Sequence, residues 1–461
     1  MAWDVFRARN LPYMTRRNYV YEAAHLLPWG LVVGITEGNV SAVVVAKTFG
    51  GSDLLIAIAV ATNLFAKLAS VVWGMLCVGR PKLRVCTVFA AATVMCVASV
   101  AATPQTPWGG WVFVGQMAAA QVFLTGVITA RSALWKSNYP KSVRGQIAAR
   151  LQVVRLLTSI GAMVAAGLLF DRQAAAYRFA YPLVAICGAV AITILQRLHV
   201  RGEHTEMREV ARSALGSDRN LETNTLGRPG NGLAEPFSLA TMLSPGNVLG
   251  QMYRVLRDDR RFARYCGALA LTGMGNLMVP PVLVIIVTQK LGMNYLASFA
   301  LLEILVRVVM MAALFRWAPF FDRVGVVRFR VVHGLSWLSS LLLGMVATVV
   351  VVSETSIGPV APVVAILLFG LSQVARGMGM GGGALAWNLG HLHFARPQEA
   401  EVYMGVHVTL TGLRGLIMPF VGIWLWMLVG WWVWLLACLL SLTGLMGYAA
   451  MAHEESVSAS T

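Results

Sequence analysis

Ionisable side chains inside otherwise apolar stretches are the residues of this sequence that could do chemistry. Such a side chain is unfavourable in lipid and usually faces a cavity or an opposite charge. Eight candidates stand out: Glu37, Lys67, Arg131, Arg155, Glu303, Arg307, Arg376 and Arg414. Cations outnumber acids in this set, so the sequence predicts a central site that favours an organic anion or a zwitterion.

The spacing and position of these residues suggest how some of them are used. Glu303 and Arg307 are four residues apart on one helical face, which favours an internal ion pair. Arg131 and Arg155 lie toward the cytoplasmic ends of their apolar stretches, where snorkelling or pairing between helices explains each of them as well as a role in the site does. Glu37 is then the most isolated acid. Because a buried carboxyl can titrate near neutral pH, we expect any proton coupling to use Glu37 or Glu303.

Uncharged polar residues and glycines occur at similar depth. The amide residues either bind a solute or form hydrogen bonds between helices, and they are Asn63, Gln116, Gln121, Asn276 and Gln373. In "GITEGN", Gly34 and Gly38 flank Glu37 and predict a bend or an unwound turn beside a central site. The glycines of "ARGMGMGGGALAWNLG" predict close helix packing or a hinge, because the stretch lacks the Lys-Ser/Thr ending of a phosphate loop.

The elements that hold these residues are predicted to be membrane-spanning helices. Of all residues 57% are hydrophobic and 12% are charged, and the mean hydropathy is +0.68, a composition unlike that of soluble domains. The runs are apolar nearly throughout rather than alternating, which favours helices over a barrel. Twelve runs are long enough to cross a bilayer: 18–47, 54–79, 83–103, 109–135, 148–170, 179–199, 262–289, 295–320, 330–352, 361–388, 402–428 and 431–452. No cleavable signal peptide is expected, since the first run spans by itself.

The distribution of basic residues predicts the orientation. Lys and Arg gather in alternate connections, and such connections stay on the cytoplasmic side. Both termini are therefore expected in the cytoplasm, in a multi-pass protein of the plasma (inner) membrane. The net charge of +17 is explained by loop cations that face anionic lipid headgroups. These cations form no basic stripe interleaved with aromatic residues, so no nucleic-acid binding is predicted.

A polar segment divides the chain into two similar parts. We predict an amino-terminal six-helix bundle at 1–199, a cytoplasmic linker at 200–260 and a carboxy-terminal six-helix bundle at 261–461. "VAKTFGGSDLLIAIAV" in the first part resembles "VTQKLGMNYLASFAL" in the second, each joining one run to the next. The fold class is therefore all-α and membrane-integral, with twelve helices in two pseudo-symmetric bundles.

The charged stretch "APFFDRVGVVRFR", after the eighth predicted span, resembles a signature of the major facilitator superfamily, G-x-x-x-D-R-x-G-R-[RK]. Asp322, Arg323, Gly325 and Arg328 fit, whereas Ala318 stands at the leading Gly. A weaker copy follows the second span as "GMLCVGRPKLR", with Val78 at the Asp position. "YPKSVRG", which contains Arg144, also resembles a loop of that family. The resemblance implies a secondary transporter that works by alternating access.

Asp322 has a physical role to play in such a loop. A carboxylate can accept hydrogen bonds from the amino end of a neighbouring helix, and flanking arginines can pair with acids or lipid phosphate. We therefore expect a cytoplasmic latch built by Asp322, Arg323, Gly325 and Arg328 near Arg144, at the start of the fifth span. The alternative is that these charges only anchor the topology.

The leading hypothesis is a secondary active transporter, a symporter or antiporter that moves a small organic anion or zwitterion with or without protons. The alternatives are a drug or hydrophobic-cation exporter, and a non-transporting sensor or assembly protein with the same fold. No enzyme, cofactor or metal site is expected, because the sequence shows no nucleophile and base pattern, and "HLH" at 391–393 lacks metal-ligand spacing. The expected partners are the bilayer, the solute and protons, and we expect a monomer.

Overall fold

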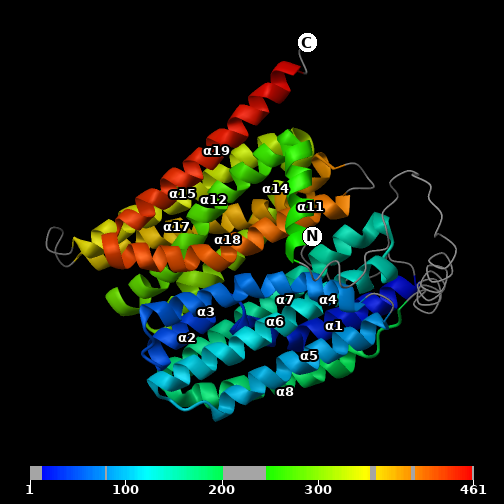
Figure 1. The fold of residues 1–461 in the computed structure, drawn as a ribbon. Helices are drawn as coiled ribbons and strands as arrows, with labels where there is room; N and C mark the ends of the chain where they lie inside the picture. The colour runs from blue at the N-terminus through cyan, green and yellow to red at the C-terminus, as the bar shows by residue number, and fades with distance from the viewer. Residues whose placement is uncertain (1–12, 78–79, 201–244, 354–359, 396–399, 459–461) are drawn as a thin grey trace.

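The computed structural model describes residues 13–77, 80–200, 245–353, 360–395 and 400–458, and within these ranges it contains helices and no strand. The first half holds α1 (Tyr13–Thr36), α2 (Val40–Thr48), α3 (Asp53–Phe65), α4 (Ala69–Cys77), α5 (Lys82–Ser99), α6 (Pro107–Asn138), α7 (Lys141–Arg172) and α8 (Tyr177–Leu195). The second half holds α11 (Pro245–Asp258), α12 (Arg260–Ile285), α13 (Tyr295–Phe299), α14 (Leu305–Val324), α15 (Val326–Val352), α17 (Ala361–Leu389), α18 (Ala400–Val429) and α19 (Trp432–Ser458) (Figure 1).

These helices agree with the predicted spans, with two interruptions. Ten helices are long and apolar enough to cross a membrane, and α1 with α2 makes an eleventh although the two are bent by 50°. The remaining predicted span corresponds to α3 and α4, which are joined by one 3-10 turn at Ala66–Leu68. Short π-helical turns also occur, at Ile286–Lys290 and at Ala300–Ile304 before α14.

Side-chain caps set where several helices begin. Ser52 accepts a hydrogen bond from the backbone N–H of Leu55 at the start of α3, and Thr106 accepts one from Gly109 at the start of α6. Asp259 accepts one from Phe262 at the start of α12. Such caps satisfy backbone donors that the first turn of a helix leaves free, so these polar residues fix the boundaries of the apolar runs.

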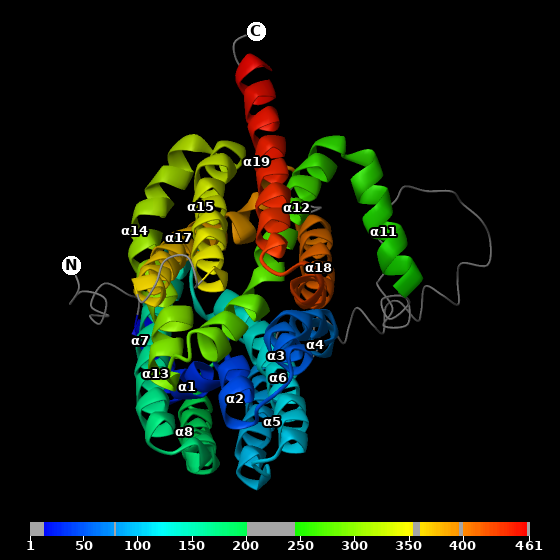
Figure 2. The same ribbon diagram turned by 90° about the vertical axis from the view of Figure 1, so that its left-hand side faces the viewer.

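The two halves use the same helix pairs. In the first half α1 packs against α7 and α8, and α5 packs against α6 and α8. In the second half the corresponding helices do the same, because α12 packs against α18 and α19, and α15 packs against α17 and α19. Figure 2 shows the two bundles one above the other, with α11 beside them. Helices in equivalent positions of the sequence thus make equivalent contacts.

The glycines of the tenth predicted span serve close packing, as predicted. An added Cβ at Gly377 would lie 2.7 Å from Val309 on α14, and one at Gly382 would lie 3.0 Å from His333 on α15. The missing side chains let α17 approach both neighbours closely. Along this part of the chain the glycines are therefore a packing surface.

The halves meet at the end of the molecule opposite the termini. Lys47 donates from Nζ to the carbonyl of Met293 at 2.9 Å. The carboxylate of Asp171 accepts hydrogen bonds from the backbone N–H groups of Tyr295 at 2.6 Å and Leu296 at 3.1 Å. Each of these bonds joins the first half to the second. This end of the interface is therefore closed.

Toward the other end the two halves separate. The surroundings of three glycines on one face of α18 show how the distance between the halves grows. An added Cβ at Gly415 would lie 2.9 Å from Leu64, and one at Gly412 would lie 2.1 Å from Leu68. Gly405 is two turns nearer to the end that carries the termini, and no atom of the described residues lies within 4 Å of its added Cβ. The interface therefore opens toward the termini.

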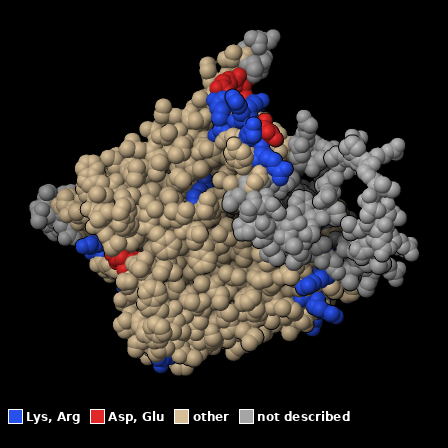
Figure 3. All heavy atoms as spheres, viewed as in Figure 1, with Lys and Arg blue, Asp and Glu red and all other residues tan. Residues whose placement is uncertain are grey.

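Charged side chains gather near the ends of the helices. Figure 3 shows Lys, Arg, Asp and Glu mainly at the two ends of the visible face, with a broad band between them that is uncharged apart from a small basic patch. At the end that carries the termini, Arg264 pairs with Glu454 at 2.7 Å and Arg261 pairs with Glu455 at 2.9 Å. The uncharged band is the surface expected to face the hydrocarbon layer.

Candidate functional site

The centre of the molecule is built around a break in the first span. α1 ends at Thr36 and α2 begins at Val40, and between them Gly38 has a φ of +76°. Residues with side chains rarely adopt this left-handed conformation, so glycine is needed here. The bend predicted from "GITEGN" is confirmed.

Polar side chains from other helices bind the backbone that the break exposes. Asn63 donates from Nδ2 to the carbonyl of Gly38 at 2.7 Å, and Gln121 donates to the carbonyl of Thr36. The backbone N–H of Asn39 donates to Oε1 of Glu303, in the second half, at 2.8 Å. Irregular backbone at this depth needs such partners. Three of the predicted site residues therefore support the break in the first span.

Two ion pairs flank the break. Nη1 of Arg155 lies 3.2 Å and 3.3 Å from the two carboxylate oxygens of Glu37, and both side chains are 23% exposed. The predicted pair of Glu303 and Arg307 is confirmed at 3.3 Å, and Arg307 also donates to Ser159 in the first half at 2.9 Å. The expectation that Glu37 is an isolated acid is wrong. Its partner comes from α7, which sequence spacing could not indicate.

Lys67 and Arg376 are central cations that have no acidic partner within hydrogen-bond distance among the described residues. Lys67 lies in the 3-10 turn between α3 and α4 and interacts electrostatically with Glu37, so it faces the middle of the molecule. Arg376 interacts electrostatically with Glu303 and donates a long hydrogen bond of 3.4 Å to Gln373. Both cations remain available to an anion.

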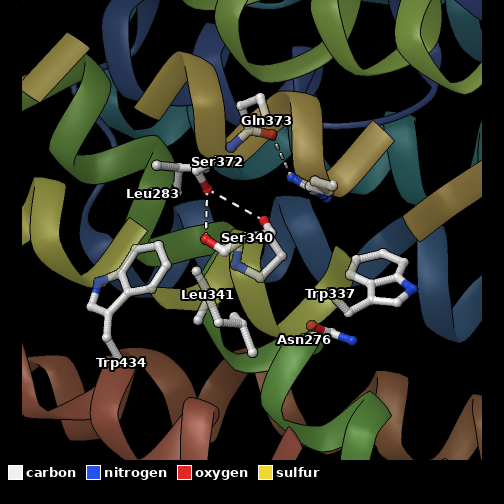
Figure 4. A pocket seen from close by; sticks show the side chains of 11 residues that line it. Asn276, Leu283, Trp337, Ser340, Leu341, Ser372, Gln373 and Trp434 are labelled. Atoms are coloured by element: carbon white, nitrogen blue, oxygen red, sulfur yellow. Dashed lines mark hydrogen bonds between the residues drawn. The ribbon is translucent and has the colours of Figure 1, made fainter. Parts of the chain in front are cut away.

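Arg376 lines a cavity in the second half, which Figure 4 shows from close by. The polar lining comes from α12, α15 and α17 and consists of Asn276, Ser340, Ser372, Gln373 and Arg376. Ser372 donates to the carbonyl of Ser340 at 2.7 Å, and the indoles of Trp337 and Trp434 complete the wall. The cavity measures about 20 Å³, which is room for one water molecule and too small for an organic solute.

Arg131 lies outside this centre because it pairs with an acid that the sequence analysis missed. Its Nε lies 2.7 Å from Oε1 of Glu22, which also accepts hydrogen bonds from Trp135 and Tyr139. Glu22 lies within the first predicted span and could have been found as a further buried acid. Gln116 is also placed away from the centre, where it donates to the carbonyl of Ser99 at 3.1 Å.

Arg414 is not part of the cavity lining. Its guanidinium is buried against α12, donates to the carbonyl of Leu269, and donates to Oγ1 of Thr411 at 3.2 Å. Near it lies Arg330, which belongs to the charged stretch at 318–330 but is only 4% exposed. Arg330 donates to Tyr265 at 2.9 Å and to the carbonyl of Ala386 at 2.9 Å. Arg330 is therefore a buried residue of the second half, unlike the exposed Arg323 and Arg328 of the same stretch.

The residues of the predicted latch lie where α14 meets α15, with Asp322 and Arg323 in the last turn of α14, Gly325 between the helices and Arg328 in the first turn of α15. Gly325 has a φ of +75°, which explains the glycine of the signature. Asp322, Arg323 and Arg328 are exposed, and the structure records no hydrogen bond from Asp322 to any described residue. The side chain of Arg144 lies outside the described residues. Among the described residues the predicted latch makes no contact, and it stays a prediction.

Comparison with known proteins identifies the fold. One solved structure with this fold is the inward open conformation of the xylose transporter XylE from E. coli. Its TM-score is 0.60 at 13% sequence identity, and the match covers 94% of this chain and 95% of that chain. A D-xylose-proton symporter gives a TM-score of 0.62 at 12% identity, over 93% and 96% of the two chains. A mutant of the nucleoside transporter NupG gives 0.58 at 12% identity, over 95% and 99%.

The sequence itself matches a family model. No curated protein sequence matches this chain. The model of the Major Facilitator Superfamily, in contrast, matches residues 28–419, which is most of the chain. The protein is thus a multi-pass membrane transporter rather than an enzyme, and it belongs to the Major Facilitator Superfamily.

Proposed function

We propose that this protein moves a small organic anion or zwitterion by alternating access, with proton coupling through Glu37. The observation that carries the proposal is the partly exposed ion pair of Glu37 and Arg155, which interacts electrostatically with Lys67 at the break of the first span. A broken helix at the interface of two repeats is the usual place for a transported solute. The functional groups of the site therefore lie where a solute would bind.

The balance of charge supports an anionic solute. Both central acids are already paired, Glu37 with Arg155 and Glu303 with Arg307. Lys67 and Arg376 are left without an acid, so the centre is short of negative charge. A carboxylate or phosphate group on the solute would supply it through charge-assisted hydrogen bonds. A drug or hydrophobic-cation exporter would need the opposite balance.

Competition for Arg155 would couple the solute to a proton. A solute anion that binds Arg155 separates it from Glu37, and a carboxylate that loses its cation binds a proton more tightly. Release of the solute restores the ion pair and expels the proton. Glu303 is less suited to this role, because its carboxylate also accepts the N–H of Asn39 and is more deeply buried.

The open end of the interface supports an inward-facing state. With both termini in the cytoplasm, as the basic loops predict, the closed end with Lys47 and Asp171 is external. The solute would then enter or leave through the gap beside Gly405.

A neutral polyhydroxylated solute is the second candidate. Amide, hydroxyl and indole groups line the cavity around Asn276, Gln373 and Trp337, and such groups suit sugar hydroxyls and rings. The solved neighbours include transporters of xylose and of nucleosides. In this case the central cations would contribute little to binding.

Binding and transport by the purified protein test the proposal. Thermal shift screening against anionic metabolites should give a ligand, since a compound that binds the folded state raises its stability. Uptake of that ligand into proteoliposomes then separates a transporter from a sensor that only binds. Lys67→Gln and Arg376→Gln should each weaken binding by about tenfold or more, the loss expected for a charge-assisted hydrogen bond.

Arg84→Gln is the matched control, because Arg84 is exposed on α5 and makes no contact with the centre. Its affinity should equal that of the natural protein. Equal affinity in all three variants, or a screen in which neutral sugars alone raise the stability, would reject the anionic solute and favour the second candidate.

A further inference from the structure

A second buried cluster lies in the carboxy-terminal half, away from the break of the first span. Five elements contribute to it: Tyr265 from α12, Arg330 from α15, His391 from the 3-10 turn Gly390–His393, His407 and Arg414 from α18, and Tyr448 from α19. Their exposed fractions run from 0% for Tyr265 and His407 to 8% for Arg414. Neither the proposed solute site nor the cavity of Figure 4 uses these side chains.

Contacts between the rings hold the cluster together. The guanidinium carbon of Arg330 lies 5.5 Å from the ring centre of Tyr265 and 6.0 Å from that of Tyr448. The imidazoles of His391 and His407 have their centres 6.5 Å apart. Arg414 follows His407 by two helical turns on the same face, and it bends back to donate to Thr411, one turn from His407. These two groups of side chains lie near each other, because Arg414 interacts electrostatically with both Arg330 and Tyr448.

The cluster contains two buried positive charges and no negative charge. Among the described residues no carboxylate forms an ion pair with Arg330 or Arg414, and each guanidinium donates only to neutral oxygen atoms. Arg414 also interacts electrostatically with Arg330, which is a repulsion. A buried charge without an opposite charge is strongly unfavourable, so this arrangement calls for an anion.

Several polar groups of the same cluster have no partner. Within the described part of the chain, no hydrogen bond is made by either ring nitrogen of His407, by Nδ1 of His391, by Nε of Arg414 or by the hydroxyl of Tyr448. An arginine Nε–H and a tyrosine hydroxyl can donate, and an imidazole donates from at least one nitrogen in any protonation state. Buried donors without partners are rare in proteins. The unpartnered groups are thus mainly hydrogen-bond donors. An anion can accept hydrogen bonds from them, whereas a metal cation cannot.

From these observations we infer that the cluster around Arg330, His407, Arg414 and Tyr448 binds a small inorganic anion of halide size. The size follows from burial: the unpartnered atoms have essentially no accessible surface, so their side chains must move apart to admit an ion, and an ion of halide size needs the smallest movement. The anion would join α18 to α19 and to α15 inside the second half. It would thereby stabilise that bundle without being the transported solute.

Thermal unfolding in chloride tests this inference without any transport measurement. Purified protein in sodium gluconate is titrated with sodium chloride or sodium bromide at constant ionic strength. The melting temperature should rise in a saturable way, as for any ligand of the folded state. A failure here would leave the proposed solute site untouched, because that site is tested by its own variants.

Two variants localise the effect. Tyr448→Phe removes only the unpartnered hydroxyl and should raise the half-saturating chloride concentration by about tenfold, the loss of roughly one hydrogen bond. Tyr253→Phe removes a hydroxyl that is exposed on α11 and should leave the titration unchanged. Arg414→Gln should abolish the chloride effect, and if it does not fold, Tyr448→Phe still decides.

Bromide gives a direct readout of position, since its anomalous scattering in a crystal should show a peak between His407, Arg414 and Tyr448. Identical melting curves in gluconate, chloride and bromide would overturn the inference. The unpartnered polar groups of the cluster would then be satisfied by water. A chloride effect of equal half-saturation in Tyr448→Phe and the natural protein would overturn it as well, by placing the anion elsewhere.

Discussion

The two central ion pairs differ in their surroundings, and this difference assigns their roles. Glu37 and Arg155 are each 23% exposed, whereas Glu303 and Arg307 are about half as exposed and bind further groups, Asn39 and Ser159. A pair in contact with water can separate and form again at little cost. The buried pair is held by its neighbours and is better suited to a permanent structural role.

Replacing Glu37 should separate accumulation from exchange. Glu37→Gln removes the proton-binding group, so accumulation driven by a pH gradient should be lost in proteoliposomes. Exchange of labelled for unlabelled solute should persist, because exchange moves no net proton. Undiminished gradient-driven accumulation would exclude Glu37 as the coupling residue.

Glu303→Gln is the comparison variant. The amide oxygen of Gln can still accept the N–H of Asn39, and only the charge beside Arg307 is lost. Coupling should survive in this variant while thermal stability falls. If Glu303→Gln loses accumulation and keeps its stability, the roles of the two acids are reversed.

Sequence reasoning identified most charged residues of the centre but few of their partners. Glu303 and Arg307 could be paired from spacing, because four residues bring two side chains onto one helical face. Glu37 and Arg155 are 118 residues apart, and only the packing of α1 against α7 brings them together. Arg414 was expected in the solute site, but depth along a span does not tell which neighbour a side chain faces.

At the scale of elements, the break between α1 and α2 is the best-supported feature. Glycines on both sides of Glu37 predicted a bend, and the left-handed φ of Gly38 explains why glycine is required. The π-helical turns at Ile286–Lys290 and Ala300–Ile304 were not predicted. Such turns depend on tertiary contacts rather than on local propensity, so apolar periodicity gives no signal for them.

Gly38→Ala should destabilise the protein in two ways. A left-handed residue with a Cβ costs about 1 to 2 kcal/mol, and this Cβ would also lie 2.3 Å from the carboxylate of Glu303. Gly50→Ala is a matched control, because Gly50 has a φ of +57° and no atom within 4 Å of its added Cβ. Both melting temperatures should fall, with the larger fall for Gly38→Ala. Equal falls would show that Glu303 moves aside freely.

At the scale of the whole molecule, the structure is closed at one end and open at the other. The hydrogen bonds of Lys47 and Asp171 join the halves at the closed end, and Asp322 lies exposed in the last turn of α14. The chain thus has an observed contact that keeps one end of the interface closed, and a predicted latch that would close the other end. Two carboxylates can therefore be tested against each other.

Asp171→Asn should shift the protein toward the outward-facing state. It weakens charge-assisted hydrogen bonds to the backbone of Tyr295 and Leu296, each contributing about 1.5 to 3 kcal/mol, enough to change a two-state ratio about tenfold or more. The reporter is Gly405→Cys, in a background without the natural cysteines, since Gly405 faces the open gap. Labelling at this position should fall, and unchanged labelling would mean that other contacts keep this end closed.

Asp322→Asn should have the opposite effect on the same reporter. If Asp322 closes the cytoplasmic end by binding the start of α7, its loss raises labelling of Gly405→Cys by about tenfold to more than a hundredfold in the ratio of states. Arg328→Gln is the control, because it changes the net charge near Asp322 and keeps the Asp322 carboxylate. A similar rise in labelling in this variant would show that a change of charge alone is sufficient. If Asp322→Asn leaves the labelling unchanged, the stretch at 318–330 has only its topological role.

The glycine face of α18 has a consequence for the speed of the cycle. At Gly412 and Gly415 the halves touch through backbone against the side chains of Leu68 and Leu64, with no side chains interlocked from both sides. A smooth contact of this kind can rotate without rotamer changes, so it adds little friction to the motion. The activation enthalpy for switching should then come from the hydrogen bonds at the closed end, and bulk added at Gly412 should slow turnover more than it weakens solute affinity.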